Sequence, residues 1–241
     1  MTFQKMPSSE SLAPVGPGAR LVPCVGVAKV PGFLALPGDA KRHRAIIIIH
    51  EWWGLSEWVK EQAEKFAASG YIALAVDLYE GEVTTNPSIA RKLKRRLRRE
   101  HMLDQLKDAF DYLASRPDVD SKHICSLGWS MGGGFAIEFV IHEPRLVACV
   151  VNYGPLPTNI ADIHKINVPV LGIFGSLDRG MGLDKIRGFE TSMKAAGKRV
   201  DIIIYDAVGH GFQNSTDQTR YRPVAAADAW LVTMEFLRLS E

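Results

Sequence analysis

The segment Gly128-Trp129-Ser130-Met131-Gly132 places a hydroxyl nucleophile between two glycines. An apolar run precedes it and small residues follow it, which predicts a strand, a tight turn and the start of a helix. Glycines leave room for the strained turn of a nucleophile elbow, and the start of a helix offers backbone N–H groups to a developing oxyanion. The pattern therefore predicts covalent catalysis by Ser130.

Two later residues could complete a catalytic triad with this serine. Asp178 follows the apolar run 168–174, and His210 follows the apolar run 200–205 in a loop between two glycines. A histidine can take the serine proton and return it to the leaving group, while a carboxylate orients the ring. In isolation Asp178 is equally well a turn residue and His210 a structural histidine. The chain order serine, acid, base, each just past a predicted strand, favours catalysis.

Apolar runs that alternate with helical patterns supply the elements to position these residues. They predict a mostly parallel central sheet with helices on both faces, which is the α/β class. Strands are predicted at 45–49, 72–76, 123–127, 147–152, 168–174 and 200–205, and helices at 58–69, 89–116, 132–142, 183–196 and 223–239. Edge strands are expected around 22–36, after a loose leader over residues 1–20. The candidate triad falls at the carboxyl ends of strands, where such sheets bind ligands.

The composition fits one globular domain over residues 1–241, with 46% hydrophobic and 23% charged residues. The net charge of +2 gives no indication of nucleic-acid binding. No apolar run reaches the roughly 18 residues of a membrane span, and the N-terminus lacks an apolar signal core, so a cytoplasmic location is expected. Cys24, Cys125 and Cys149 lack metal-ligand spacing. Neither a metal nor another cofactor is predicted, and the two later cysteines, in predicted strands, are expected to be buried thiols.

Five segments of the chain together resemble the dienelactone hydrolase family of α/β-hydrolases. They are the residues 46–55, 75–79, 128–133, 175–178 and 209–212. The similarity extends from about residue 30 to the C-terminus. It implies the α/β-hydrolase fold and the hydrolysis of a carboxylic ester or lactone, a small-molecule substrate, through an acyl-enzyme.

The resemblance also assigns roles to individual residues. It implies that Asp178 is the acid and His210 the base, with Ser130 at the nucleophile position. The backbone N–H groups of Trp52 and Met131 would form the oxyanion hole. Glu51 matches a glutamate that approaches the nucleophile in the family.

The sequence departs from the family pattern at the nucleophile and at two further positions. The best-known members use cysteine, so beside Ser130 the residue Glu51 is expected to hold the loop or tune the pocket. Two arginines that clamp a substrate carboxylate are replaced by Gly81 and Asn214. The nearest other arginines in sequence are Arg179, whose side chain is expected to point away from the substrate, and Arg220. Neutral esters or lactones are therefore expected as substrates.

Tryptophans flank the candidate nucleophile. Trp52, Trp53 and Trp129 are expected to wall an aromatic, largely apolar pocket, although Trp53 could equally plug the upper edge of the sheet. The adjacent pair His50-Glu51 could suggest a metal ligand set. No second histidine stands at helical spacing to complete one, so a metal site is not predicted.

A basic run at 91–99 favours a different function. It holds seven positive charges and no acid, so the chain could be a non-catalytic α/β-hydrolase-fold scaffold that recruits an anionic partner. However, Ile89, Leu93 and Leu97 recur every four residues, and later apolar residues continue the stripe. The simpler interpretation is one amphipathic helix over 89–116 with a solvated basic face, preceded by a cap loop at 80–88.

Overall fold

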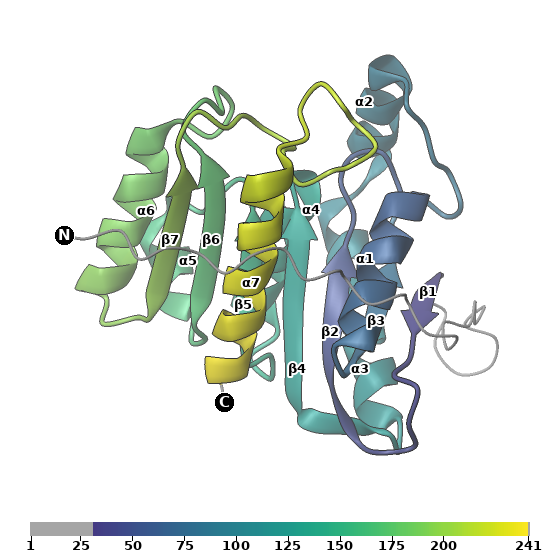
Figure 1. The fold of residues 1–241 in the computed structure, drawn as a ribbon. Coiled ribbons are helices and arrows are strands. Elements are labelled where there is room, and N and C mark those ends of the chain that lie inside the picture. The colour runs from purple at the N-terminus through teal and green to yellow at the C-terminus, as the bar shows by residue number, and fades with distance from the viewer. Residues whose placement is uncertain (1–30, 241) are drawn as a thin grey trace, which may run out of the picture.

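The computed structural model describes residues 31–240. Seven strands form one sheet in the order β1-β3-β2-β4-β5-β6-β7 (Figure 1). The strands are β1 (Gly32–Ala35), β2 (His43–Ile49), β3 (Tyr71–Val76), β4 (Val119–Trp129), β5 (Cys149–Asn152), β6 (Val170–Gly175) and β7 (Val200–Tyr205). Only β1 runs antiparallel to its neighbour. The predicted α/β class is confirmed. The expected leader and the residues before 31 of the expected edge strands lie outside the described residues.

Helices cover both faces of this sheet, as predicted (Figure 1). They are α1 (Glu57–Ala68), α2 (Pro87–Arg96), α3 (Arg99–Ser115), α4 (Met131–His142), α5 (Ile160–Lys165), α6 (Leu183–Ala195) and α7 (Pro223–Leu239). The helices α3, α4, α5 and α6 contact one another in succession along one face. On the other face α1 meets α7, where the rings of Phe66 and Trp230 lie 4.7 Å apart. The short helix α5 was not among the predicted elements.

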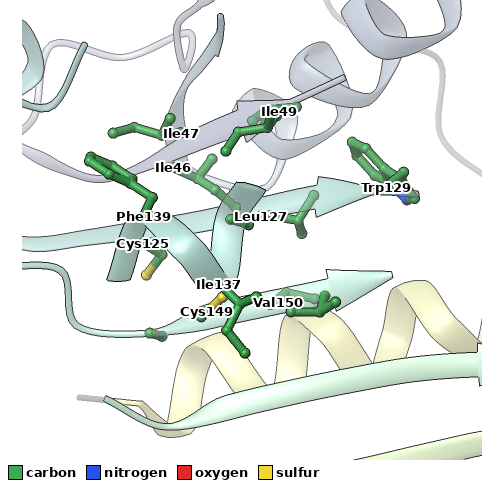
Figure 2. Packing of buried hydrophobic residues seen from close by; sticks show 14 of the residues in the cluster. Ile46, Ile47, Ile49, Cys125, Leu127, Trp129, Ile137, Phe139, Cys149 and Val150 are labelled. Atoms are coloured by element: carbon green, nitrogen blue, oxygen red, sulfur yellow. The ribbon is translucent and has the colours of Figure 1, made fainter. Parts of the chain in front are cut away.

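The middle of the sheet is buried from both sides, which explains its uninterrupted apolar sequence. Residues 45–49 of β2 are fully buried between β3 and β4. Helix α4, which carries the buried residues Ile137 and Phe139, packs on β4 and β5 (Figure 2). Cys125 and Cys149 lie within this core, and burial raises the pKa of both thiols to about 12. Both cysteines are therefore inert, buried thiols, as expected.

The single helix predicted over 89–116 is wrong, because the chain forms two helices there. Leu97 and Arg98 adopt extended backbone conformations between α2 and α3. Repulsion between basic residues four apart disfavours a continuous helix through the basic run. The apolar stripe also changes phase: Leu93 is buried, but the next strongly buried residue is Met102, while Ile89 is 46% exposed. A break of two residues lets both helices turn their apolar sides inward.

Among residues 31–240, no helix is long and apolar enough to cross a membrane. The expected single domain and cytoplasmic location stay predictions.

Candidate active site

Ser130 occupies a sharp turn between β4 and α4. Its backbone has φ 54° and ψ −116°, a conformation that side chains rarely adopt. The turn is possible because its neighbours lack side chains. A Cβ on Gly128 would lie 2.1 Å from the carbonyl oxygen of Gly132, and a Cβ on Gly132 would lie 2.2 Å from that of Ile49. The predicted elbow is thus present, with Ser130 at the N-terminus of a helix whose first N–H groups have no acceptor within it.

The structure brings Ser130, His210 and Asp178 into one hydrogen-bonded series. The hydroxyl oxygen of Ser130 lies 2.8 Å from Nε2 of His210, and Nδ1 of His210 lies 2.6 Å from Oδ2 of Asp178. The imidazole is 34% exposed, whereas the Asp178 side chain is only 2% exposed. The acid is therefore shielded from water, and the histidine remains open to a reacting group.

Asp178 is held in its ionised form despite this burial. Burial by itself raises the pKa of a carboxyl, but the hydrogen bond from His210 and a backbone hydrogen bond from Gly180 bring the pKa of Asp178 below its ordinary 3.8. The N–H of Gly180 donates to Oδ1 at 2.9 Å, which leaves Oδ2 for the histidine. An ionised carboxylate at this place can fix the imidazole tautomer and stabilise an imidazolium.

The loops that carry the acid and the histidine are packed against each other. Asp178 follows β6 and His210 follows β7, and these strands are parallel neighbours. The N–H of Leu177 donates to the carbonyl of Val208 at 2.8 Å. A Cβ on Gly175 would lie 2.2 Å from the same carbonyl oxygen. This close approach fixes the separation of the two side chains.

Glu51 lies in the loop after β2, which packs against the start of α4. Its side chain is buried, and Nδ2 of Asn214 donates to its Oε2 at 2.9 Å. Burial raises the pKa of Glu51 above its ordinary 4.5, in spite of the bond from Asn214 and the proximity of His210. The structure thus places Glu51 next to the triad, in surroundings that favour its neutral form. Trp52 follows Glu51 in this loop and Met131 begins α4, and the oxyanion hole assigned to their N–H groups stays a prediction.

His50 has a structural environment. The ring is fully buried, and its Nε2 accepts a hydrogen bond from the N–H of Leu78 at 3.2 Å. Its Nδ1 is then the donor to the carbonyl of Glu51, at 2.5 Å. Burial lowers the pKa of His50, so the ring is neutral and ties the loop after β2 to the end of β3. In the part of the chain that the structure describes, no group of three or more His, Cys, Asp or Glu residues could hold a metal.

The three tryptophans have different surroundings. Trp52 and Trp53 are half-buried with ring centroids 4.7 Å apart, and the N–H of Thr84 in the cap loop donates to the Trp53 carbonyl. Trp129 is 3% exposed, and its ring packs edge-on against Trp58 in α1. The structure therefore places Trp129 beneath the catalytic turn, with little surface left for a substrate.

The positions expected for a carboxylate clamp carry no arginine. Gly81 has φ 93°, which an arginine would adopt only with strain, and Asn214 is engaged with Glu51. Arg179 is exposed. Arg220 lies beside Gly211 in the histidine loop, and its Nε is 3.3 Å from Asp217. Arg220 thus lies against the loop of His210, and a carboxylate already accompanies it.

Three residues near the triad carry no recognisable sequence signal. Tyr153 follows β5 with φ 40°, and its ring lies 5.1 Å from that of His210. Its buried hydroxyl lies close to the carboxyl of Glu51 and lowers the pKa of that group. Asn152 and Gln213 are hydrogen-bonded to each other and to the nucleophile turn. Each of these contacts joins residues far apart in the sequence, so only the folded chain reveals them.

A cavity of about 250 Å³ begins beside the nucleophile turn and follows one side of α4. Its apolar lining comes from α4 and from the segment after β5. These lining residues include Met131, Phe135, Ile141, Pro155 and Leu156. Lys94 and Arg99 lie at its border.

The sheet order, the helices on both faces and the turn at the end of β4 define an α/β-hydrolase (Figure 1). The chain belongs to the dienelactone hydrolase family, whose sequence profile matches residues 30–240. A similar protein is a putative carboxymethylenebutenolidase of Methylorubrum extorquens, 26% identical over 87% of this chain and 76% of the relative. Membership makes this protein a hydrolase of esters or lactones.

Solved structures show the same fold. The putative dienelactone hydrolase from Klebsiella pneumoniae superposes with a TM-score of 0.80 at 23% identity, over 87% of this chain and 93% of the other. The propionate-bound thermophilic esterase Est2 of Thermogutta terrifontis gives a TM-score of 0.72 at 21% identity, over 92% and 94% of the two chains.

Proposed function

We propose that this protein cleaves a carboxylic ester or lactone through a Ser130-His210-Asp178 triad and an acyl-enzyme intermediate. The observation that carries the proposal is the hydrogen-bonded series from the serine hydroxyl to the buried carboxylate, with separations of 2.8 and 2.6 Å. In the first step Ser130 Oγ bonds to the acyl carbon while His210 Nε2 takes its proton. The imidazolium then protonates the leaving alkoxide as the carbon–oxygen bond breaks.

In the second step water hydrolyses the acyl-enzyme, and His210 again acts first as base and then as acid. His210 takes a proton from the water as its oxygen attacks the acyl carbon, and Ser130 leaves with that proton. In both steps the backbone N–H groups of Trp52 and Met131 would stabilise the oxyanion at the helix N-terminus. Asp178 keeps the imidazole in the required tautomer throughout.

The cavity along α4 supports small substrates with an apolar group. Its volume of about 250 Å³ lies just below the range of drug-sized ligand sites, ~300–1,000 Å³. Met131 belongs both to its lining and to the proposed oxyanion hole, which favours this end of the cavity for the acyl group. Turnover of activated acetate, butyrate and octanoate esters should identify the chain length that fits.

Substitution of the triad tests the proposal. Ser130→Ala and His210→Ala should each lower kcat for an activated ester by several orders of magnitude, because the nucleophile and its base act as a unit. A fluorophosphonate should label the wild-type protein at Ser130 and leave Ser130→Ala unlabelled. Ser69→Ala and His164→Ala are controls outside the site and should retain full activity. Retention of most activity in Ser130→Ala would refute the assignment.

A further inference from the structure

Asn152, at the carboxyl end of β5, is bonded to the nucleophile turn by both its main chain and its side chain. In the sheet it lies opposite Trp129. Its carbonyl oxygen accepts from the N–H of Ser130 at 2.9 Å, and its Nδ2 donates to the carbonyl of Gly128 at 3.2 Å. Asn152 is 1% exposed, so water does not compete for these bonds. One buried residue, through its main-chain carbonyl and its side-chain amide, therefore holds the turn on both sides of Trp129.

Gln213 connects this arrangement to the loop of the catalytic histidine. It lies three residues after His210, and its Nε2 donates to Oδ1 of Asn152 at 2.8 Å. Its Oε1 accepts from Nε1 of Trp129, also at 2.8 Å. Each amide atom has one role in this series: the oxygen of each amide accepts and its nitrogen donates. A side chain without that paired donor and acceptor cannot complete it.

We propose that Gln213 and Asn152 are positioning residues that set the distance between Ser130 and His210. The inference rests on the proposed function of the triad. Asp178 fixes the Nδ1 side of the imidazole by a hydrogen bond. The Nε2 side must also lie within hydrogen-bonding distance of the Ser130 hydroxyl, which is carried by the turn after β4. Gln213 supplies a direct hydrogen-bonded connection between the histidine loop and the turn that carries this hydroxyl. A displacement of about 1 Å at such a place can slow catalysis about 100-fold.

The first test is Gln213→Met, which keeps the length of the side chain and removes both hydrogen bonds without adding a charge. We expect kcat for a neutral ester to fall about 10- to 100-fold, with KM changed less than about threefold, because proton transfer is affected and substrate binding is not. Gln218→Met is the matched control, since this exposed glutamine of the same loop bonds only the Ser215 carbonyl. A kcat equal to that of the control would overturn the proposal.

The second test is Gln213→Glu, whose protonation changes its hydrogen-bonding capacity. The ionised carboxylate cannot donate to Asn152, whereas the protonated acid can donate to Asn152 and accept from Trp129. The kcat of the variant relative to wild type should therefore rise as the pH is lowered. Gln218→Glu should show no such rise. A ratio independent of pH, or a loss that follows only the fraction of folded protein, would reduce Gln213 to a structural role.

A crystal structure of Gln213→Met gives a readout that does not depend on activity. The separation of Ser130 Oγ from His210 Nε2 should exceed 3.5 Å, beyond hydrogen-bonding distance, while the Asp178–His210 bond remains. An unchanged separation would contradict the positioning role. If instead the wild-type protein hydrolysed no ester, the proposed function would be refuted. The Ser130–His210 separation in the Gln213→Met crystal structure would still test whether Gln213 positions the two residues.

Discussion

At the scale of single residues, the backbone of Ser130 adopts a strained conformation that directs its hydroxyl toward His210. A non-glycine residue in such a conformation costs on the order of 1–3 kcal/mol and persists only where the surroundings enforce it. At Ser130 this backbone conformation is enforced by the close packing of Gly128 and Gly132 and by the hydrogen bond from the Ser130 N–H to the Asn152 carbonyl. The strain therefore coincides with the proposed nucleophile.

Glu51 provides a prediction about pH and stability. Burial raises its pKa in the folded protein, so between its ordinary pKa of 4.5 and that raised value the folded state binds more protons than the unfolded state. The contribution of Glu51 to the unfolding free energy is therefore fully present below its ordinary pKa. This contribution is lost as the pH rises through the raised pKa of the folded protein. Glu51→Gln imitates the neutral form. The unfolding free energy of wild type minus that of Glu51→Gln should fall across this interval.

Denaturant unfolding of both proteins at a series of pH values measures this difference. Glu57→Gln serves as the control, because Glu57 is exposed on α1. A difference between wild type and Glu51→Gln that rises with pH would show that Glu51 is ionised in the folded protein.

Substrate charge gives a second prediction at this scale. With Gly81 and Asn214 at the clamp positions and Asp217 beside Arg220, no unpaired arginine is fixed at those positions to bind a substrate carboxylate. A neutral ester should exceed its carboxylate-bearing analogue in kcat/KM about tenfold, equivalent to ~1.4 kcal/mol. Steady-state kinetics on the matched pair measures it. A preference for the carboxylate that disappears in Arg220→Gln would mean that Arg220 has replaced the clamp.

The three residues that the structure joins by hydrogen bonds, Ser130, His210 and Asp178, could be selected from the sequence because each follows a strand in a short, recognisable segment. The sequence did not indicate Asn152, Tyr153 or Gln213. Asparagine, tyrosine and glutamine are common in loops, and the side-chain hydrogen bonds of Asn152 and Gln213 reach partners 24 to 84 residues away. Likewise Trp129 is adjacent to Ser130 in sequence, but strand geometry turns its ring to the opposite side of the sheet from α4, against Trp58.

At the scale of elements, α2 carries a concentrated positive charge. Its basic residues are exposed, and Arg96 is paired with Glu82 of the cap loop. Replacing Arg95, Arg96 and Arg98 by glutamine should leave turnover of a neutral ester within a few-fold of wild type, because exposed charges are screened over ~10 Å in ordinary buffer.

The same variant tests whether the basic run also recruits an anionic partner, as the scaffold hypothesis holds. Wild type would bind DNA or anionic vesicles in a salt-sensitive manner, and the triple variant would not. A variant with glutamine at Lys165, Arg187 and Lys194 removes the same charge from other helices and controls for net charge. Binding lost only when Arg95, Arg96 and Arg98 are replaced would favour recruitment of such a partner.

The positions of strands and helices were predictable wherever the periodicity was uniform. Strand β7 and helix α7 have the predicted bounds. The break at Leu97 was not predictable from the spacing of Ile89, Leu93 and Leu97. Apolar spacing describes one face of a helix, but it contains no information on how far the surface that this face packs against extends. Leu97 instead packs near Leu78 and Tyr79 at the end of β3.

At the scale of the whole molecule, stability depends on the core between the two helical layers. Leu127 of β4 is 1% exposed, whereas Leu231 of α7 is 66% exposed. Leu127→Ala should lower the unfolding free energy by about 2–5 kcal/mol through lost burial and the cavity left behind. Leu231→Ala deletes the same atoms and should change it by less than about 0.5 kcal/mol. Equal losses in denaturant unfolding would show that β4 does not lie in a packed core.

The spacing of the triad along the chain also has a consequence for biosynthesis. Ser130 and His210 are separated by 80 residues, and Asp178 and His210 by 32. At ~5–20 residues per second, a ribosome adds the histidine roughly 4–16 s after the serine. A nascent chain that ends before β7 has the proposed nucleophile but not the proposed base, so we expect it not to turn over an ester. During refolding, hydrolytic activity should therefore return only when β6 and β7 have joined the sheet. Its return should come later than any spectroscopic signal that reports the pairing of β2, β3 and β4 alone.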